Sequence, residues 1–302
     1  MSIDKPASYN SVLRKCALLL TFTVLAASAG KAQDIPFTLE KGLIVVKAKI
    51  FRDIPVDAVI ATGNASSAVN LDFVLRNKYT PGYTNDRKNE PVIFVDVLKI
   101  AIGDQSPGSL RMMASSLADA GTRTGREIAL LLGADFFKGK ILQIDFKNRV
   151  IRFLKVPPLD YATAFSQPPV STFVFRMEQE SQSFLGQTVT LPVVREASIN
   201  GSKVRSLLET YVPYPITVSP SAIKEFSLGQ MPPKGTMQSG NLKSFSLAGL
   251  DIPDIPARFV GKGAGFDTDV SDYGAIIGVA VLQNYKATFD WKEKVVVLER
   301  AR

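Results

Sequence analysis

Short runs of continuous or alternating apolar residues recur along the chain, and they predict strands. The clearest runs are rich in β-branched residues, a composition typical of strands. They lie at residues 42–51, 56–60, 92–100, 141–146 and 150–154. Glycine, proline and Asn-Gly pairs separate them. Segments that favour helices are short and lie at residues 72–77, 134–137 and 220–226. The pattern therefore predicts a mostly β protein with short helices.

Two parts of the sequence repeat each other in the same order. The matched segments are residues 46–71 with 194–219, at an offset of 148, and residues 131–153 with 276–298, at an offset of 145. The first match aligns Thr62 with Thr210, and the second aligns Gly133 with Gly278. Segments this long and this few do not indicate a solenoid. Because the two offsets differ by only three residues, the repeat predicts an internal duplication.

The duplication predicts two similar β lobes joined by a linker. Residues 156–170 contain four prolines and separate the two strand-rich halves. We therefore expect one lobe at residues 33–155 and the other at residues 171–302. Hairpins that would flank a cleft are expected where glycine and proline cluster, at residues 79–92 and 235–240.

The first 32 residues predict an export signal. Arg14 and Lys15 precede an apolar run of 14 residues that begins at Cys16. This is the length of a signal-peptide core and is short for a membrane span. Small residues follow, so cleavage is expected after Ala29 or Ala32. We expect export to a bacterial-type periplasm or outside the cell and no membrane contact beyond this segment. The alternatives are an uncleaved anchor or a start codon placed too early.

Composition excludes several kinds of chemistry. The chain has no histidine, which excludes Ser-His-Asp and Cys-His catalysis and histidine-bound metals. Its one cysteine lies in the predicted signal segment, so disulfides within the chain and cysteine-bound zinc are excluded too. The formal net charge is +8, but basic and acidic residues alternate without a long basic run. We therefore expect no metal, no cofactor and no nucleic-acid partner.

The repeated segments resemble the two lobes of aspartic peptidases of the retropepsin and pepsin type. In that family each lobe has a strand leading into an Asp-Thr-Gly loop, and a later apolar-apolar-Gly strand lies beside the loop. Here the loops read Ala-Thr-Gly at residues 61–63 and Glu-Thr-Tyr at residues 209–211, and the later strands end at Gly133 and Gly278. The resemblance covers about residues 35–300 and is closest to exported bacterial proteins with two such lobes. It implies two acid-protease β-barrel lobes with a cleft between them.

Both catalytic positions depart from the family pattern. The family's chemistry needs one carboxylate from each lobe, because one acts as acid while the other acts as base. Ala61 occupies the first acid position and Glu209 the second, and Tyr211 replaces the glycine that lets the backbone turn sharply. Asp57, on the same strand as Ala61, would lie about 13 Å from it and cannot substitute. Glu209 alone could act as a general base, but no acid remains for the leaving amine.

The resemblance therefore implies a catalytically inactive homologue. Thr62 and Thr210 are kept in both lobes, and in the family these hydroxyls hydrogen-bond across the lobe interface. The inherited cleft near Thr62, Thr210, Gly133 and Gly278 is expected to bind an extended peptide or protein segment. If Tyr211 fills the space between the loops, no groove remains. Two alternatives stay open: an active aspartyl endopeptidase with an atypical dyad, and a structural or assembly protein that uses its lobes as surface.

The remaining candidate sites favour structural roles. Asp145 and Asp290 occupy equivalent positions after a strand, so a shared role in a turn or in strand pairing is expected. Asp135 is expected in a turn or a surface strand. Residues 261–265 lack the spacing and ending of a phosphate loop. Residues 267–272 carry three aspartates but not the glutamate that closes a calcium loop.

Overall fold

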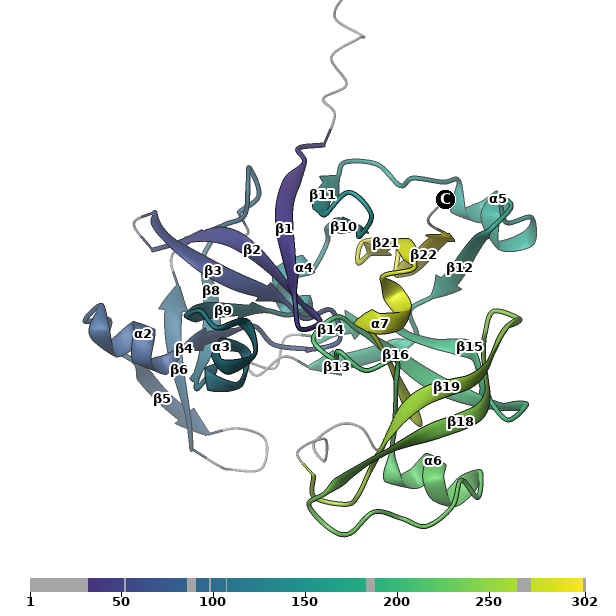
Figure 1. Ribbon diagram of the computed structural model, residues 1–302. Coiled ribbons are helices and arrows are strands. Elements are labelled where there is room, and N and C mark those ends of the chain that lie inside the picture. The colour runs from purple at the N-terminus through teal and green to yellow at the C-terminus, as the bar shows by residue number, and fades with distance from the viewer. Residues whose placement is uncertain are drawn as a thin grey trace, which may run out of the picture. The chain divides into compact units, whose positions relative to one another are not determined.

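The strands form one large sheet, one closed barrel and one separate pair (Figure 1). The computed structural model describes residues 32–51, 53–85, 91–97, 99–106, 108–182, 188–264 and 273–300. Residues Asp34–Arg302 form one compact unit. The prediction of a mostly β protein with short helices is confirmed. Nearly all of the predicted signal segment, and the aspartates of residues 267–272, lie outside the described residues.

The large sheet has fourteen strands, and its main path runs β12-β22-β21-β10-β11-β1-β2-β3-β9-β4-β8-β6-β5, with β7 off this path and paired with β2. Its strands in chain order are β1 (Ile35–Glu40), β2 (Leu43–Ile50), β3 (Ile54–Ile60), β4 (Ala68–Asn70), β5 (Gly82–Asn85), β6 (Pro91–Val97), β7 (Ile100–Ala101), β8 (Leu110–Ser115), β9 (Ile128–Leu132), β10 (Ile141–Asp145), β11 (Val150–Leu154), β12 (Thr172–Arg176), β21 (Tyr285–Asp290) and β22 (Val295–Arg300).

The closed barrel has the strand order β15-β16-β20-β17-β19-β18. Its strands are β15 (Val193–Ile199), β16 (Ser202–Glu209), β17 (Ile216–Val218), β18 (Met237–Leu247), β19 (Leu250–Val260) and β20 (Ala275–Gly278). The separate antiparallel pair consists of β13 (Gln179–Gln182) and β14 (Thr188–Leu191). The described helices are α2 (Leu71–Arg76), α3 (Ala118–Thr124), α4 (Ala134–Phe137), α5 (Tyr161–Ser166), α6 (Pro220–Glu225) and α7 (Val279–Leu282).

Strand β2 has apolar residues on both of its faces. Successive side chains of a strand point to opposite sides. Ile44 and Val46 belong to the main core, whereas Leu43 and Val45 belong to a second, smaller apolar cluster. A strand covered on both sides needs a nearly continuous apolar run, as the sequence here has. The first four residues of β2 are therefore buried on both faces, whereas the two lysines farther along the strand are exposed.

The strand pairings repeat at the offsets seen in the sequence. Val59 pairs with Leu131 in the parallel pair β3–β9, and the residues aligned with them, Leu207 and Ile276, pair in the parallel pair β16–β20. The order β2-β3-β9-β4-β8-β6 corresponds to β15-β16-β20-β17-β19-β18. In the second set β18 pairs with β15 and closes the barrel, and in the first β7, which follows β6, pairs with β2. The register of the strands thus repeats with the sequence.

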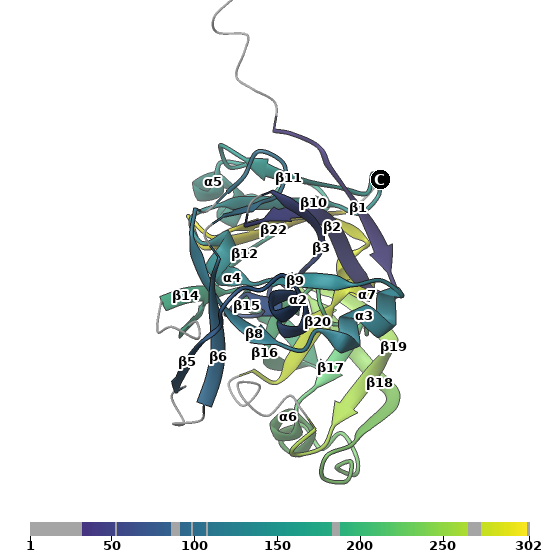
Figure 2. The ribbon, with the colours of Figure 1, turned by 90° about the vertical axis from the view of Figure 1, so that its left-hand side faces the viewer.

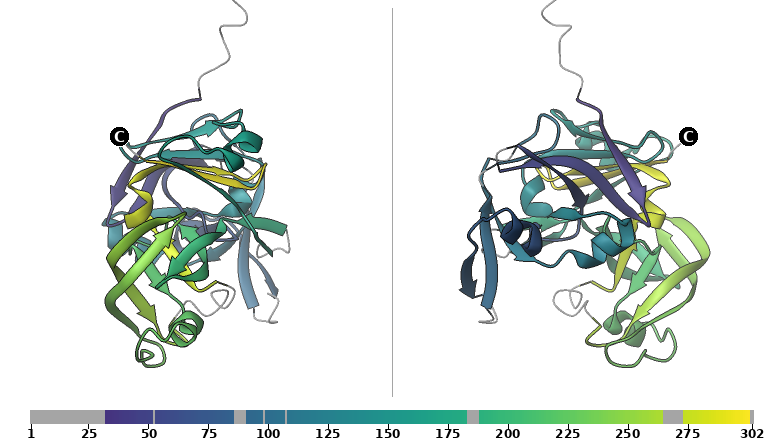
Figure 3. Two further views of the ribbon diagram at one scale, coloured as in Figure 1. Left: turned by 90° about the vertical axis from the view of Figure 1, so that its right-hand side faces the viewer. Right: turned by 60° about the vertical axis from the view of Figure 1, so that its left-hand side comes forward.

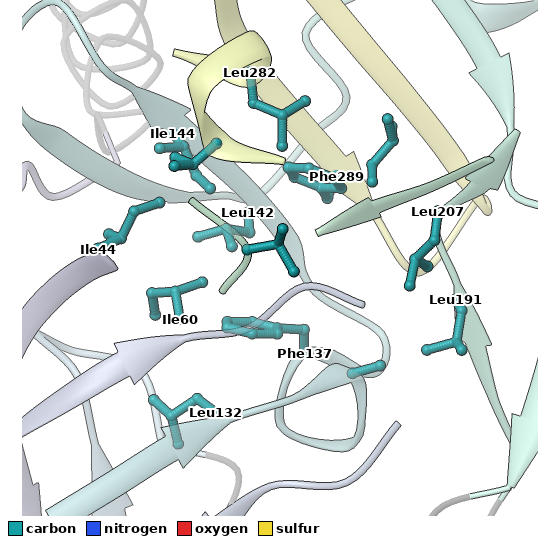
Figure 4. Packing of buried hydrophobic residues seen from close by; sticks show 14 of the residues in the cluster. Ile44, Ile60, Leu132, Phe137, Leu142, Ile144, Leu191, Leu207, Leu282 and Phe289 are labelled. Atoms are coloured by element: carbon teal, nitrogen blue, oxygen red, sulfur yellow. The ribbon is translucent and has the colours of Figure 1, made fainter. Parts of the chain in front are cut away.

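Strands from both halves of the chain share the large sheet and the main core. Strand β10 of the first half pairs antiparallel with β21 of the second, and the sheet continues from β21 through β22 to β12. Figure 4 shows side chains of both halves in this core, among them Leu142, Ile144, Leu282 and Phe289. Burial of these aliphatic and aromatic side chains is the main force that holds the halves together.

Three of the six described helices match the predicted segments, namely α2, α4 and α6. Helix α5 lies inside the segment expected to be a linker. Asp160 caps it by accepting a hydrogen bond from the N–H of Ala162, and the Tyr161 hydroxyl donates to Asp290 (3.0 Å). Residues 156–170 are therefore not simply a linker, because their helix is bound to the end of β21.

The two expected hairpins have different outcomes. Strands β5 and β6 pair antiparallel, as expected for residues 79–92, although residues 86–90 lie outside the described chain (Figure 2). The hairpin expected at residues 235–240 is wrong. Met237–Gly240 open the long strand β18, and its turn into β19 comes at Ala248 and Gly249, both with positive φ (Figure 3). The strand continues through residues 237–240 because they pair with residues 257–260 of β19.

Candidate functional site

The two loops aligned by the repeat meet through reciprocal hydrogen bonds. Thr62 Oγ1 donates to the Leu208 carbonyl (2.9 Å) and accepts from the N–H of Thr210 (3.2 Å). Thr210 Oγ1 donates to the Ile60 carbonyl (2.8 Å) and accepts from the N–H of Thr62 (3.2 Å). Both threonines are fully buried. The two loops are therefore joined by four buried bonds that obey the symmetry of the repeat, and we call this contact the threonine joint.

Close backbone approach explains the two glycines beside the joint. A Cβ added to Gly133 would lie 2.6 Å from the carbonyl oxygen of Asn64, and one added to Gly278 would collide with the carbonyl of Tyr214. Both glycines have extended backbone, so the requirement is for space and not for positive φ. Each apolar-apolar-Gly strand can thus pass directly beside the loop of its own half.

Ala61 contributes no polar group to the site. Its side chain is fully buried in the smaller apolar cluster. We call this group the Ala61 cluster, and its buried members are Leu43, Val45, Val59, Ala61, Ala68, Leu117, Ala120, Ile128 and Leu131. The position that would hold the first acid of a dyad is therefore part of an aliphatic surface.

Glu209 is the one acid at the joint among the described residues, and its carboxyl contacts both loops. The side chain is 3% exposed. Oε1 accepts from the N–H of Tyr211 (2.8 Å), and the N–H groups of Gly63 and Thr210 also hydrogen-bond the carboxyl. Burial raises the pKa of Glu209 to about 7, although these backbone hydrogen bonds lower it. The carboxyl thus reaches across from the second loop to Gly63 of the first.

Asp57, an acid on β3, already has charged partners. This residue forms ion pairs with Lys47 (2.7 Å) and Arg126 (3.6 Å). Both partners are cations, so the Asp57 carboxylate is already paired on β3. Glu209 is left to act by itself, either as an acid or as a base but not as both at once.

Asp135 is a structural part of the site that the sequence did not reveal. It lies in α4, not in a surface strand, and it accepts hydrogen bonds from the Ser67 N–H (2.9 Å) and hydroxyl (2.5 Å) and from the Phe136 N–H (2.8 Å). The Ser67 hydroxyl in turn accepts from the N–H of Gly133 (2.9 Å). Burial raises the pKa of Asp135. Asp135 therefore ties the end of the Ala61–Gly63 loop to the strand that passes beside it.

Asp145 and Asp290 have the shared role in turns that their equivalent positions predict. Asp145 accepts from the backbone N–H of Asn148 (3.0 Å). Asp290 accepts from the backbone N–H groups of Lys292 (2.9 Å) and Glu293 (2.8 Å). Each carboxylate stabilises the tight turn that follows its strand, and neither lies at the threonine joint.

Tyr211 turns toward helix α3 and covers part of the Ala61 cluster. Its ring packs against the cluster, and its hydroxyl donates to Asp119 of α3 (3.3 Å). Arg123 of α3 donates to the carbonyl of Tyr211 (3.3 Å), with its guanidinium 5.3 Å from the centre of the ring. Burial raises the pKa of Tyr211 to about 12, so its hydroxyl stays protonated and can donate at neutral pH.

The residues named for a binding cleft lie inside this arrangement. Thr62 and Thr210 are fully buried, and Gly133 and Gly278 lie against backbone. None of the four presents an open surface to a ligand. A ligand near the joint would contact the residues around it, first of all Tyr211 and α3.

Two surface hollows lie away from the joint. One, of about 440 Å³, is lined by charged groups that already have partners, such as Lys286 with Glu299 (3.0 Å) and Asp145 with Arg152 (3.4 Å). The other, of about 610 Å³, lies along α2. Within the described residues, no three acidic side chains gather in a way that would hold a metal ion.

Two comparisons give no family for this chain. No protein-family model and no curated protein sequence matches it. Among the described helices, none is long and apolar enough to cross a membrane. The function must therefore be inferred from the threonine joint and its surroundings.

Proposed function

We propose that this chain is an exported, non-catalytic relative of the two-lobed retropepsin- and pepsin-like aspartic peptidases, and that it binds an extended peptide or protein segment that runs from the edge of β5 to the threonine joint. The observation that carries the proposal is the set of four reciprocal hydrogen bonds of Thr62 and Thr210, two between these residues and two from their hydroxyls to carbonyls of the opposite loop. These bonds join two loops that the sequence repeat aligns.

The repeated strand register supports the two-lobed part of the proposal. Each set contains a parallel pair beside the joint, β3–β9 in one and β16–β20 in the other. Each set also has a short strand, β4 or β17, that pairs antiparallel with the second member of that pair. A chance arrangement would not place the same pairings at both offsets.

The environment of Glu209 supports the absence of catalysis. Peptide hydrolysis by a carboxylate dyad needs one group to take a proton from water while another gives one to the leaving amine. Ala61 supplies neither function, and Glu209 is buried and held by backbone N–H groups of both loops. A carboxyl in this position stabilises the joint, because it accepts hydrogen bonds from both sides.

Open strand edges support binding of an extended segment. Strand β5 is the end strand of the large sheet, and its Tyr83 is 73% exposed. An extended peptide can add to such an edge through backbone hydrogen bonds and place alternate side chains on the protein. In Figure 1 the β5–β6 and β18–β19 ribbons lie on either side of α3.

A peptide-selection experiment tests the proposal. Random peptides displayed on phage are selected against the full chain, and an enriched peptide is labelled and titrated by fluorescence anisotropy. We expect saturable binding without cleavage of the peptide, and weaker binding to the Tyr83→Ala variant. Val170→Ala is the matched control, because Val170 is also exposed (84%) but lies beside the opposite end strand, β12.

Each failure has a distinct meaning. Cleavage of the peptide by the unmodified chain would contradict the non-catalytic assignment and favour an endopeptidase with an atypical dyad. Failure to enrich any peptide would contradict the binding assignment and favour a structural or assembly protein.

A further inference from the structure

We propose that helix α3 is a removable cover over the apolar face that carries Ala61. Contacts of Arg123 and Tyr211 hold the helix on this face, and opening of the helix admits an extended segment with aliphatic side chains. The identity of the ligand rests on the proposed function. The opening of α3 does not depend on the proposed function, so an experiment can contradict the opening of α3 and the identity of the ligand separately.

The surface under α3 is a continuous aliphatic face. Val45 pairs with Val59, and Val59 pairs with Leu131, so these side chains are cross-strand neighbours on β2, β3 and β9. All three belong to the Ala61 cluster. The alternate residues of the same strands, such as Ile44 and Ile60, point into the main core. The strands would therefore keep their main core if α3 moved away.

Helix α3 covers this face with few apolar side chains. Ala120, on α3, and Leu117, just before it, belong to the buried cluster, and Figure 1 shows α3 beside β9. The face itself supplies larger aliphatic residues, namely Leu43, Val45, Val59, Ile128 and Leu131. Because such a face is costly to leave in water, it needs a cover, but the cover need not be this helix.

The sequence of α3 does not favour a helix. Its seven residues include Gly121 and two threonines, and its N-cap, Leu117, makes no side-chain cap hydrogen bond. Glycine costs about 1 kcal/mol relative to alanine inside a helix, and helices this short are unstable alone in water. Tertiary contacts must therefore hold α3 in its helical form.

The contacts that hold α3 are few, and several lie near the long limit for hydrogen bonds. Arg123 donates to the carbonyls of Tyr211 (3.3 Å) and Lys41 (3.2 Å). Asp119 accepts from the Tyr211 hydroxyl (3.3 Å), whereas its ion pair with Arg123 (3.5 Å) lies within α3 and does not tie the helix to the sheet. Asp119 is largely exposed to solvent. Such contacts contribute little each, so α3 is expected to open far more often than the strands beneath it.

The chemistry of the uncovered face defines the ligand. The buried cluster is apolar throughout, and its polar border is Tyr211, whose N–H is bonded to Glu209 of the threonine joint. A segment with aliphatic side chains at alternate positions would replace Leu117 and Ala120. Charged side chains at those positions would be excluded, because they would be buried without partners.

Hydrogen exchange on the full chain tests the opening directly. Arg123→Ala should loosen the cover. Gly121→Ala should tighten it, because alanine favours a helix and its Cβ would require only a shift of a few tenths of an ångström from the carbonyl of Arg126, 3.3 Å away. Arg111→Ala is the matched control, because Arg111 also has an ion pair and an aromatic contact but lies on β8. We expect α3 amides to exchange at least about tenfold faster than those of β9 in the unmodified chain.

The variants should shift this exchange in opposite directions. Arg123→Ala should speed exchange in α3 about tenfold without changing β9, Gly121→Ala should slow it, and Arg111→Ala should leave it unchanged. If α3 and β9 exchange together and Arg123→Ala speeds both equally, α3 is part of the core and the proposal is wrong.

Binding measurements test the opening of α3 and the identity of the ligand separately. The probe is the apolar dye 8-anilinonaphthalene-1-sulfonate, followed by the peptide enriched in the selection described above. Both should bind more tightly to Arg123→Ala and less tightly to Gly121→Ala, by the factor by which the open population changes. If the dye and the peptide bind the unmodified chain and both variants with equal affinity, the proposal that α3 covers the binding face is wrong. Opening of α3 and dye binding without any peptide binding would leave the cover standing and contradict the proposed function instead.

Discussion

Glu209 shows how one side chain can serve two loops. Its carboxyl accepts from the N–H of Tyr211 in its own loop, and the N–H of Gly63 in the other loop also hydrogen-bonds it. An aspartate has one methylene fewer and would not extend as far toward Gly63. At the same time Ala61 leaves the opposite position apolar, so only one ionisable group needs to be accommodated in a buried place.

The raised pKa of Glu209 predicts a pH-dependent stability. In the folded chain the carboxyl keeps its proton up to about pH 7, whereas the unfolded chain loses it near pH 4.5. The free energy of unfolding should therefore decrease as the pH rises from about 4.5 to about 7 and level off above that. The total change is about 3 kcal/mol at 1.36 kcal/mol per pKa unit.

Urea denaturation at a series of pH values measures this contribution. Glu209→Gln should remove the decrease, because the amide does not titrate, and the difference between the two profiles isolates Glu209. Glu225→Gln should keep the wild-type profile, since Glu225 is exposed on α6. Parallel profiles for the unmodified chain and Glu209→Gln would show that Glu209 titrates normally.

The threonine joint predicts a large loss of stability for a nearly isosteric change. Thr62→Val removes the donor to the Leu208 carbonyl and the hydroxyl that accepts from the N–H of Thr210, both in a buried place. We expect a cost of about 3 kcal/mol in the free energy of unfolding. Thr217→Val is the control, because the Thr217 hydroxyl is buried without a hydrogen-bond partner, so its loss should be neutral or stabilising. If the two substitutions change the free energy of unfolding equally, the hydrogen bonds of the threonine joint do not stabilise the chain as predicted.

At the scale of elements, the strands that pass the joint depend on the space beside their glycines. Gly278→Ala should destabilise the chain by more than about 4 kcal/mol or prevent folding, because the new Cβ would overlap the carbonyl of Tyr214. Thermal denaturation measures the effect. Gly121→Ala, also at negative φ but with more space, serves as the control and should not lower the melting temperature. A folded, stable Gly278→Ala variant would mean that the loop can move away from the strand.

Local patterns predicted strands well and weak helices poorly. The predicted segments 141–146 and 150–154 agree with β10 and β11, because β-branched runs bounded by turns have few other solutions. Helix α3 was not predicted, because Gly121 and its threonines disfavour a helix, and distant contacts such as those with Tyr211 and the Ala61 cluster hold it. The strand through residues 237–240 was missed for a related reason, since its partner β19 decides its conformation.

The pairing of the two threonines at the candidate site was predicted from the sequence, but the residues that surround them were not. The repeat aligned Thr62 with Thr210, and these residues do bond to each other. The role of Asp135 was missed, because its partner Ser67 lies 68 residues away and no local signal connects them. The contact between Tyr211 and Asp119 spans 92 residues and was missed for the same reason.

At the scale of the whole molecule, the account rests on two sets of strands that meet at one joint and share one core. Strands β10 and β21 come from equivalent places in the repeat and pair with each other in the large sheet. Such an arrangement brings the two loops together whether or not they carry acids. The frame that joins the loops is therefore separable from the side chains at Ala61, Glu209 and Tyr211, and the proposed function attributes the loss of catalysis to these three positions alone.

Peptide hydrolysis tests this separation most directly. The full chain is compared with the triple variant Ala61→Asp, Glu209→Asp, Tyr211→Gly, with and without Arg123→Ala to loosen α3, from acid to neutral pH. We predict that the unmodified chain cleaves no peptide and that the triple variant does, faster when α3 is loosened. Cleavage by the unmodified chain that Glu209→Gln abolishes would contradict the account, because one buried carboxyl would then be sufficient for catalysis.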